Sequence, residues 1–71
     1  MMKTQVGTVT QFADGFFQVV SPGAAAHLRV LYLRASQMNG ARLGDRVEMV
    51  YQSTATRGWW SVARVFGKAT N

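Results

Sequence analysis

The chain of 71 residues has no cysteine, one histidine and only three acidic residues. Without cysteine it cannot form a disulfide framework, a thiolate zinc site or a cysteine nucleophile. A single histidine cannot make a zinc site alone, and no two of the carboxylates are spaced as a paired general acid and base. The sequence also has no glycine-rich phosphate loop. We therefore expect a binding protein rather than an enzyme, with no metal and no cofactor.

Long apolar runs are absent as well. No run approaches the roughly 20 residues of a transmembrane helix, and the opening residues, Met1 to Gln5, turn polar too early for a signal peptide. We expect a cytoplasmic protein that does not enter a membrane. Because 48% of its residues are hydrophobic and only one is proline, the chain is expected to fold. Its length predicts one domain spanning residues 1–71.

Positive charge is abundant for so few charged residues. Eight Lys and Arg side chains against three acidic ones give a net charge of +5 and a pI near 10.9. Six of the eight are arginine, which binds phosphate through its forked donors and stacks on rings better than lysine does. A polyanion is the natural partner; the alternative is that a small basic domain is merely soluble. The arginines are scattered, so only folding can gather them: Arg29, Arg34, Arg42, Arg46, Arg57 and Arg64.

Glycine-containing turns separate segments that have strand character. The predicted strands are Gln5 to Phe12, Phe16 to Val20, His27 to Leu33, Arg46 to Gln52 and Trp59 to Phe66. Ala13-Asp14-Gly15 predicts a tight hairpin between the first two strands. The three alanines that end at Ala26 are too few to nucleate a helix, whereas Ala35 to Met38 predicts a single helical turn before an Asn39-Gly40 turn.

Five short strands without a long helix predict an all-β domain. At this size an open sheet would leave a bare face and two edges, so we expect the strands to close into a barrel. An OB-type barrel and an SH3-like barrel both have five strands. The tight first hairpin and the helical turn between the third and fourth strands favour the OB type.

Five segments, in the same order, resemble the motifs of bacterial cold-shock proteins. Gly7-Thr8-Val9 with Phe12 resembles G-T-V-K-W-F, and Asp14 to Val19 resembles K-G-F-G-F-I. Val30 to Met38 resembles V-F-V-H-x-S-x-I. Leu43 to Met49 resembles L-x-E-G-Q-x-V-x-F, and Arg57-Gly58 with Val62 to Val65 resembles K-G-P-x-A-x-N-V. The resemblance implies a five-stranded, OB-type closed barrel, cold-shock-like, that binds single-stranded nucleic acid.

Three departures from the family pattern fall on its binding face. Asp14 replaces a basic residue, Gln11 replaces an exposed Trp, and Gln18 replaces a stacking Phe. What remains of that face is Phe12, Phe16, Tyr32 and Arg34.

Alternation along the second and third strands assigns the side chains to faces. If Gln18 points to solvent, Phe16 does too, while Phe17 and Val19 point to the core. In the third strand, Tyr32 and Arg34 are expected outside, and Leu31 and Leu33 inside.

We therefore expect binding of single-stranded DNA or RNA with little sequence preference. Phe12, Phe16 and Tyr32 would stack on bases, because every base has a face that an aromatic ring can contact. Arg34, Arg57 and Lys3 would hold phosphates. Trp60 and Arg64 would extend this binding surface.

The paired tryptophans lead to a second hypothesis. Neighbours on a strand point to opposite faces, and the family resemblance predicts Trp59 inside with Ala63 and Val65. A row of Trp60, Val62 and Phe66 would then be exposed beside Arg64, as at a protein interface. On this alternative, the domain is a β-barrel interaction or assembly module that has lost the ancestral nucleic-acid function. It would form a homodimer or bind a protein partner through this row.

The remaining polar residues are expected to have local roles. His27 is expected to face solvent. Asp45 is expected to organise a turn, and Glu48 to lie on the outer face of the fourth strand beside an arginine.

Overall fold

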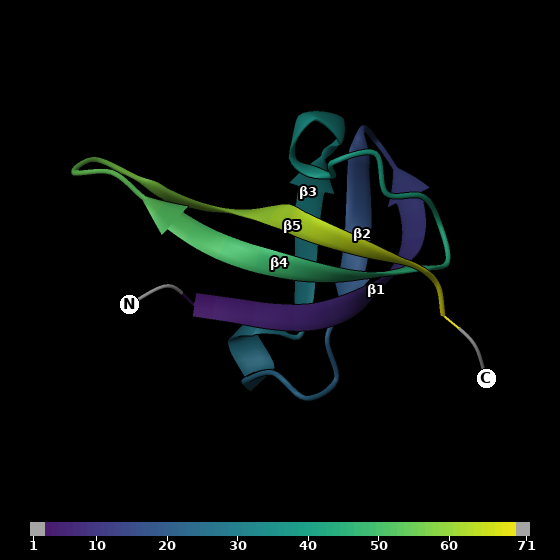
Figure 1. Ribbon diagram of the computed structural model, residues 1–71. Coiled ribbons are helices and arrows are strands. Elements are labelled where there is room, and N and C mark those ends of the chain that lie inside the picture. Colours follow the sequence, from purple (N-terminus) through teal and green to yellow (C-terminus); the bar gives the residue numbers. More distant parts are fainter. Residues whose placement is uncertain (1–2, 70–71) are drawn as a thin grey trace.

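The computed structural model describes residues 3–69, in which five strands form one antiparallel sheet (Figure 1). Two single 3-10 turns, η1 (Ala26–Leu28) and η2 (Ala35–Gln37), lie before and after the third strand. The all-β prediction is confirmed. The strands are β1 (Lys3–Ala13), β2 (Phe16–Val20), β3 (Val30–Arg34), β4 (Asp45–Ser53) and β5 (Gly58–Lys68).

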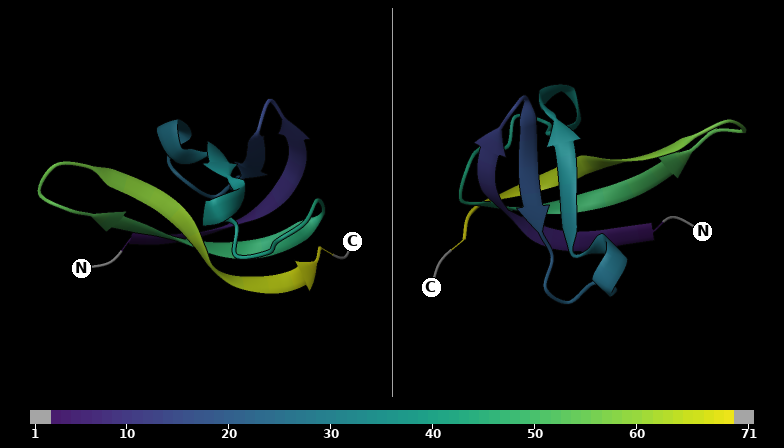
Figure 2. Two further views of the ribbon diagram at one scale, coloured as in Figure 1. Left: turned by 90° about the horizontal axis from the view of Figure 1, so that it is seen from above. Right: turned by 180° about the vertical axis from the view of Figure 1, so that it is seen from behind.

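The long strand β1 belongs to both halves of the sheet, whose order is β3-β2-β1-β4-β5. Residues Lys3 to Thr8 pair with β4, and Thr8 to Ala13 pair with β2. β1 curves between these two partners, so β2 and β3 cross over β4 and β5 at a steep angle (Figure 2). Backbone hydrogen bonds do not join β3 to β5 within the described residues, and the sheet is therefore not closed by them.

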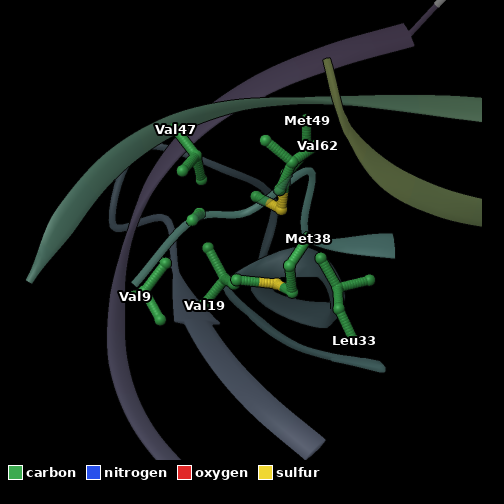
Figure 3. Close-up of a cluster of buried hydrophobic side chains, with 8 residues drawn as sticks. Val9, Val19, Leu33, Met38, Val47, Met49 and Val62 are labelled. Atoms are coloured by element: carbon green, nitrogen blue, oxygen red, sulfur yellow. The ribbon is translucent and has the colours of Figure 1, made fainter. Parts of the chain in front are cut away.

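The core lies between the two halves (Figure 3). Each strand contributes side chains to it, and Met38 and Ala41 are added from the segment between η2 and β4. Phe17, Leu31 and Trp60 are partly buried against this cluster. Its buried members are Val9, Val19, Leu33, Met38, Ala41, Val47, Met49 and Val62.

The predicted turns are present. Asp14 and Gly15 have φ values of 55° and 84°, as a two-residue hairpin of type I′ requires. Asn39 and Gly40 have φ values of 52° and 78° in the turn after η2. The residue types at these turns therefore specify the chain reversals.

The predicted start of the third strand is wrong. His27 lies in η1, exposed to solvent as expected, and β3 begins only at Val30. The reason is a tertiary contact: Gln5 of β1 donates a hydrogen bond from Nε2 to the Leu28 carbonyl, at 2.9 Å. This bond holds η1 against β1. Without such a tertiary contact, a short alanine-rich segment would not form a helical turn by itself.

β-Bulges decide which side chains of β5 point inward. Between the pairs Met49–Val62 and Glu48–Arg64, β5 carries one extra residue, Ala63, that has no partner on β4. A bulge of this kind reverses the alternation beyond it. Val62 is therefore buried while Arg64 is exposed, although a regular strand would place both on one face.

The predicted orientation of the tryptophans is consequently wrong. Trp60 pairs with Tyr51 and shares the inward face with Met49 and Val62, so its ring packs against the core. Trp59 lies on the other face. Ala63, predicted to point inward, is exposed at the bulge.

This packing predicts unequal effects of truncating the two rings. Trp60→Ala should lower the free energy of unfolding by about 3 kcal/mol, the lower end for loss of a large ring, because the half-buried Trp60 ring packs against the core. Trp59 is also half-buried, but its ring lies on the outer face beside Arg57, so Trp59→Ala should cost no more than about 1 kcal/mol. Urea denaturation of both variants measures the difference. A larger loss for Trp59→Ala would contradict the described orientation of β5.

Candidate functional site

The outer face of β2 and β3 gathers aromatic, amide and guanidinium groups. Phe16 lies opposite Arg34, and Gln18 lies opposite Tyr32. The Arg34 Cζ is 4.9 Å from the centre of the Phe16 ring, a cation–π contact. Tyr32 is the most exposed of the large hydrophobic residues within 3–69, at 62%. The predicted grouping of Phe16, Tyr32 and Arg34 on one outward face is confirmed.

A second arginine–aromatic pair lies at the end of the β4–β5 hairpin. The Arg57 Cζ is 5.1 Å from the Trp59 ring. The Thr54 N–H donates to the Arg57 carbonyl at 2.7 Å, and the Thr54 hydroxyl accepts from the Arg57 N–H at 3.3 Å. These bonds fix the turn and hence the position from which Arg57 reaches Trp59.

An open hollow of about 690 Å³ lies between the two arginine–aromatic pairs. Arg34, Ser36 and Gln37 line it from the end of β3 and from η2. The hairpin contributes Gln52, Arg57, Gly58, Trp59 and Ser61. Arg34 and Arg57, which are distant in the sequence, therefore line the same hollow.

Gln37 joins the two walls of this hollow. Its side-chain Oε1 accepts a hydrogen bond from the Arg34 N–H at 2.8 Å. Its Nε2 donates to the Trp60 carbonyl at 2.7 Å. The amide thus connects the end of β3 to β5, where no backbone ladder connects them.

None of the three acidic side chains lines this hollow, and two of them have local roles. Asp45 accepts a hydrogen bond from the Arg42 N–H at 2.9 Å, so its predicted role in a turn is confirmed. Glu48 pairs with Arg64 at 3.1 Å, as expected for an outward residue of the fourth strand. This is the one ion pair among residues 3–69. No carboxylate is among the residues that line the hollow.

Phe12 does not join the predicted stacking face. Thr10 is an extra residue in β1 between the pairs Val9–Val19 and Gln11–Gln18. Beyond this bulge, Phe12 lies opposite Phe17, with ring centroids 4.5 Å apart, on the face that carries the core. Half of Phe12 is exposed at the rim of that face, away from Phe16 and Tyr32.

Three other predicted residues also lie outside the hollow. Lys3 lines a separate, smaller hollow with Tyr51 and Trp60. The Trp60 side chain packs against the core. Arg64 lies beside Glu48 on the outer face of β4 and β5.

The predicted interface row is not an exposed patch. Val62 is only 6% exposed and Trp60 contacts the core. Phe66 is 53% exposed, but it is an unpaired residue of a second bulge in β5, between the pairs Val47–Val65 and Arg46–Gly67.

The sequence predicted only Arg34 and Arg57 among the residues that line the hollow, and the missed residues include Trp59 and Gln37. Trp59 would follow from alternation once the inward phase of β5 is known. The bond of Gln37 to Arg34 is a local cap of η2, but its bond to Trp60 carries no local signal, because Trp60 is distant in the sequence.

Comparison of the chain with protein-family models, curated proteins and solved structures gives no match. Residues 3–69 contain no cluster of His, Asp and Glu side chains that would hold a metal ion. The helical segments in this range are single 3-10 turns, and none would cross a membrane.

The bridge by Gln37 predicts a measurable contribution to stability. Gln37→Ala removes two hydrogen bonds, each with a net value of about 0.5–1.5 kcal/mol, so the free energy of unfolding should fall by about 1–3 kcal/mol. Gln52→Ala is the control, since Gln52 lines the same hollow but its side-chain Oε1 accepts only one long hydrogen bond, from the Ser61 hydroxyl at 3.4 Å. Urea denaturation should show a change within about 0.5 kcal/mol for the control. Equal losses for the two variants would contradict the bridging role.

Proposed function

We propose that this protein binds single-stranded DNA or RNA with little sequence preference, along the outer face of β2–β3 and into the hollow beside the β4–β5 hairpin. The observation that carries the proposal is the pair of arginine–aromatic stacks, Arg34 on Phe16 and Arg57 on Trp59, that flank one hollow. Neither guanidinium is in an ion pair among the described residues.

The chemistry of these groups suits a flexible polyanion. A base stacks on the exposed Tyr32 ring or on the plane of a guanidinium group. Arginine donors bind the phosphate between successive bases. Stacking contributes about 1–3 kcal/mol per base and accepts any base. The binding residues are therefore Phe16, Tyr32, Arg34, Arg57 and Trp59.

The fold we propose is a partly open, OB-type barrel, cold-shock-like in its motifs. β1 pairs with both β2 and β4, which leaves β3 and β5 as the two edges. The side chain of Gln37 spans the gap between them. In OB folds, the face of strands 2 and 3 and the loops between strands 1–2 and 4–5 bind oligonucleotides. The two arginine–aromatic stacks lie on the corresponding face and beside the corresponding β4–β5 loop.

The alternative, a protein-interaction or assembly module, has weaker support. The exposed row that motivated it contains the buried Val62. Such a module would need a different surface on this domain.

A titration with labelled oligo-dT and oligo-U at two salt concentrations tests the proposal. Binding that neutralises about two phosphates, one for each arginine of the site, should give a log–log slope of about −1.4, since each contact on a single strand contributes about 0.7. Affinity that is undetectable at low salt, or that does not depend on salt, would favour the interaction module.

Single substitutions separate stacking from charge. Tyr32→Ala should weaken binding by about 1–3 kcal/mol and leave the salt slope unchanged. Arg34→Ala and Arg57→Ala should each weaken binding and flatten the slope by about 0.7. Arg42→Ala removes the same charge from an exposed position outside the hollow, and should have a smaller effect in the same titration. Equal effects for all three arginines would indicate diffuse charge attraction without a defined site.

A further inference from the structure

The opposite face of the β4–β5 hairpin carries a second hollow, of about 230 Å³. It is lined by Lys3 of β1, His27 and Leu28 of η1, Tyr51 of β4 and Trp60 of β5. Its volume is below the roughly 300–1,000 Å³ of sites that enclose a drug-sized ligand. The hollow is therefore of a size for one ring system and not for an entire nucleotide.

The lining groups combine two aromatic rings with the ammonium group of Lys3 and the imidazole of His27. The Tyr51 and Trp60 rings have centroids 5.4 Å apart and are tilted by 57°. A β-carbon on Gly58 would collide with the Tyr51 ring, so that ring lies directly over the Gly58 backbone. Lys3 and His27 are exposed at the opening. No carboxylate lines the hollow, and a ligand with one flat ring and a negative charge fits this set of groups.

The two hollows meet at adjacent residues of β5. Gln52 lies opposite Trp59, and Tyr51 lies opposite Trp60, so the two tryptophans point to opposite faces of the hairpin. Trp59 lines the larger hollow and Trp60 the smaller one. β5 is an edge strand, and its hairpin with β4 projects beyond the rest of the sheet (Figure 1). A flexible strand has a short path from one hollow to the other across this edge.

We propose that the hollow of Lys3, His27, Tyr51 and Trp60 is a second nucleotide site, which takes the base of a later nucleotide of the bound strand. The inference rests on the proposed binding of single strands. The base contacts the Tyr51 and Trp60 rings, and the Lys3 ammonium and the His27 ring bind the adjacent phosphate. The strand thus passes around the projecting hairpin, with one tryptophan on each side.

The indole N–H resonances of the two tryptophans report on the two sites separately. Nitrogen-15-labelled protein is titrated with oligo-dT of increasing length, and the signals are assigned with Trp59→Phe. The shortest oligonucleotides should shift the Trp59 signal, and longer ones should shift the Trp60 signal too. Lys3→Ala combined with His27→Ala should suppress the second shift and lower the affinity for long oligonucleotides severalfold, while leaving the affinity for short ones unchanged.

Lys68→Ala is the matched control for charge, because Lys68 is exposed at the far end of β5. It should leave the Trp60 shift intact. If saturating long oligo-dT shifts Trp59 but not Trp60, the second site is disproved and the primary function stands. If neither signal shifts and no binding occurs, both proposals fail. A Trp60 shift that persists in the Lys3 and His27 double variant would also overturn the assignment of these residues.

Discussion

The candidate site depends on one side-chain amide that connects two strands the backbone leaves apart. Gln37 accepts from the Arg34 N–H and donates to the Trp60 carbonyl. The next residue, Met38, is buried in the core, so η2 is held both by hydrogen bonds and by packing. Without this bridge, only the packing of buried side chains such as Leu33, Met38 and Val62 would set the separation of β3 and β5. The hollow between Arg34 and Arg57 is therefore a consequence of tertiary packing, and neither strand forms it alone.

Bulges determine which side chains of the folded domain face solvent. In β1 the extra residue Thr10 turns Phe12 toward the Phe17 side of the sheet. In β5 the extra residue Ala63 allows Val62 to be buried while Arg64 remains outside. A regular period of two cannot satisfy both requirements. The irregular positions thus let a small domain bury enough apolar surface and still place arginines and rings on its outer faces.

The sequence predicted the features that depend on local chemistry. Turn residues located the hairpin at Asp14-Gly15, and alternation correctly assigned the faces of β2 and β3, including Tyr32. It failed where the period is broken, at Phe12 and Trp60, because nothing in the amino-acid types marks a bulge. It also failed to find the hollow. The contact that shapes the hollow joins Gln37 to Trp60, and such a pairing is decided only when the two halves of the sheet pack together.

Exposed aromatic rings are costly for a domain of this length. A chain of about 60–70 residues buries only about 60% of its extended surface, so each ring left outside is unavailable to the core. Tyr32 is nevertheless 62% exposed, and Phe16 on the same face has the Arg34 guanidinium group over its ring. A fold selected for stability alone would place such rings inside. Two of the three acidic residues show the complementary pattern, because Asp45 and Glu48 have partners outside both hollows. Binding of a single strand by stacking and by phosphate contacts requires aromatic rings that face solvent beside arginines without an ion-pair partner. The two features together support the proposed function better than either feature would alone.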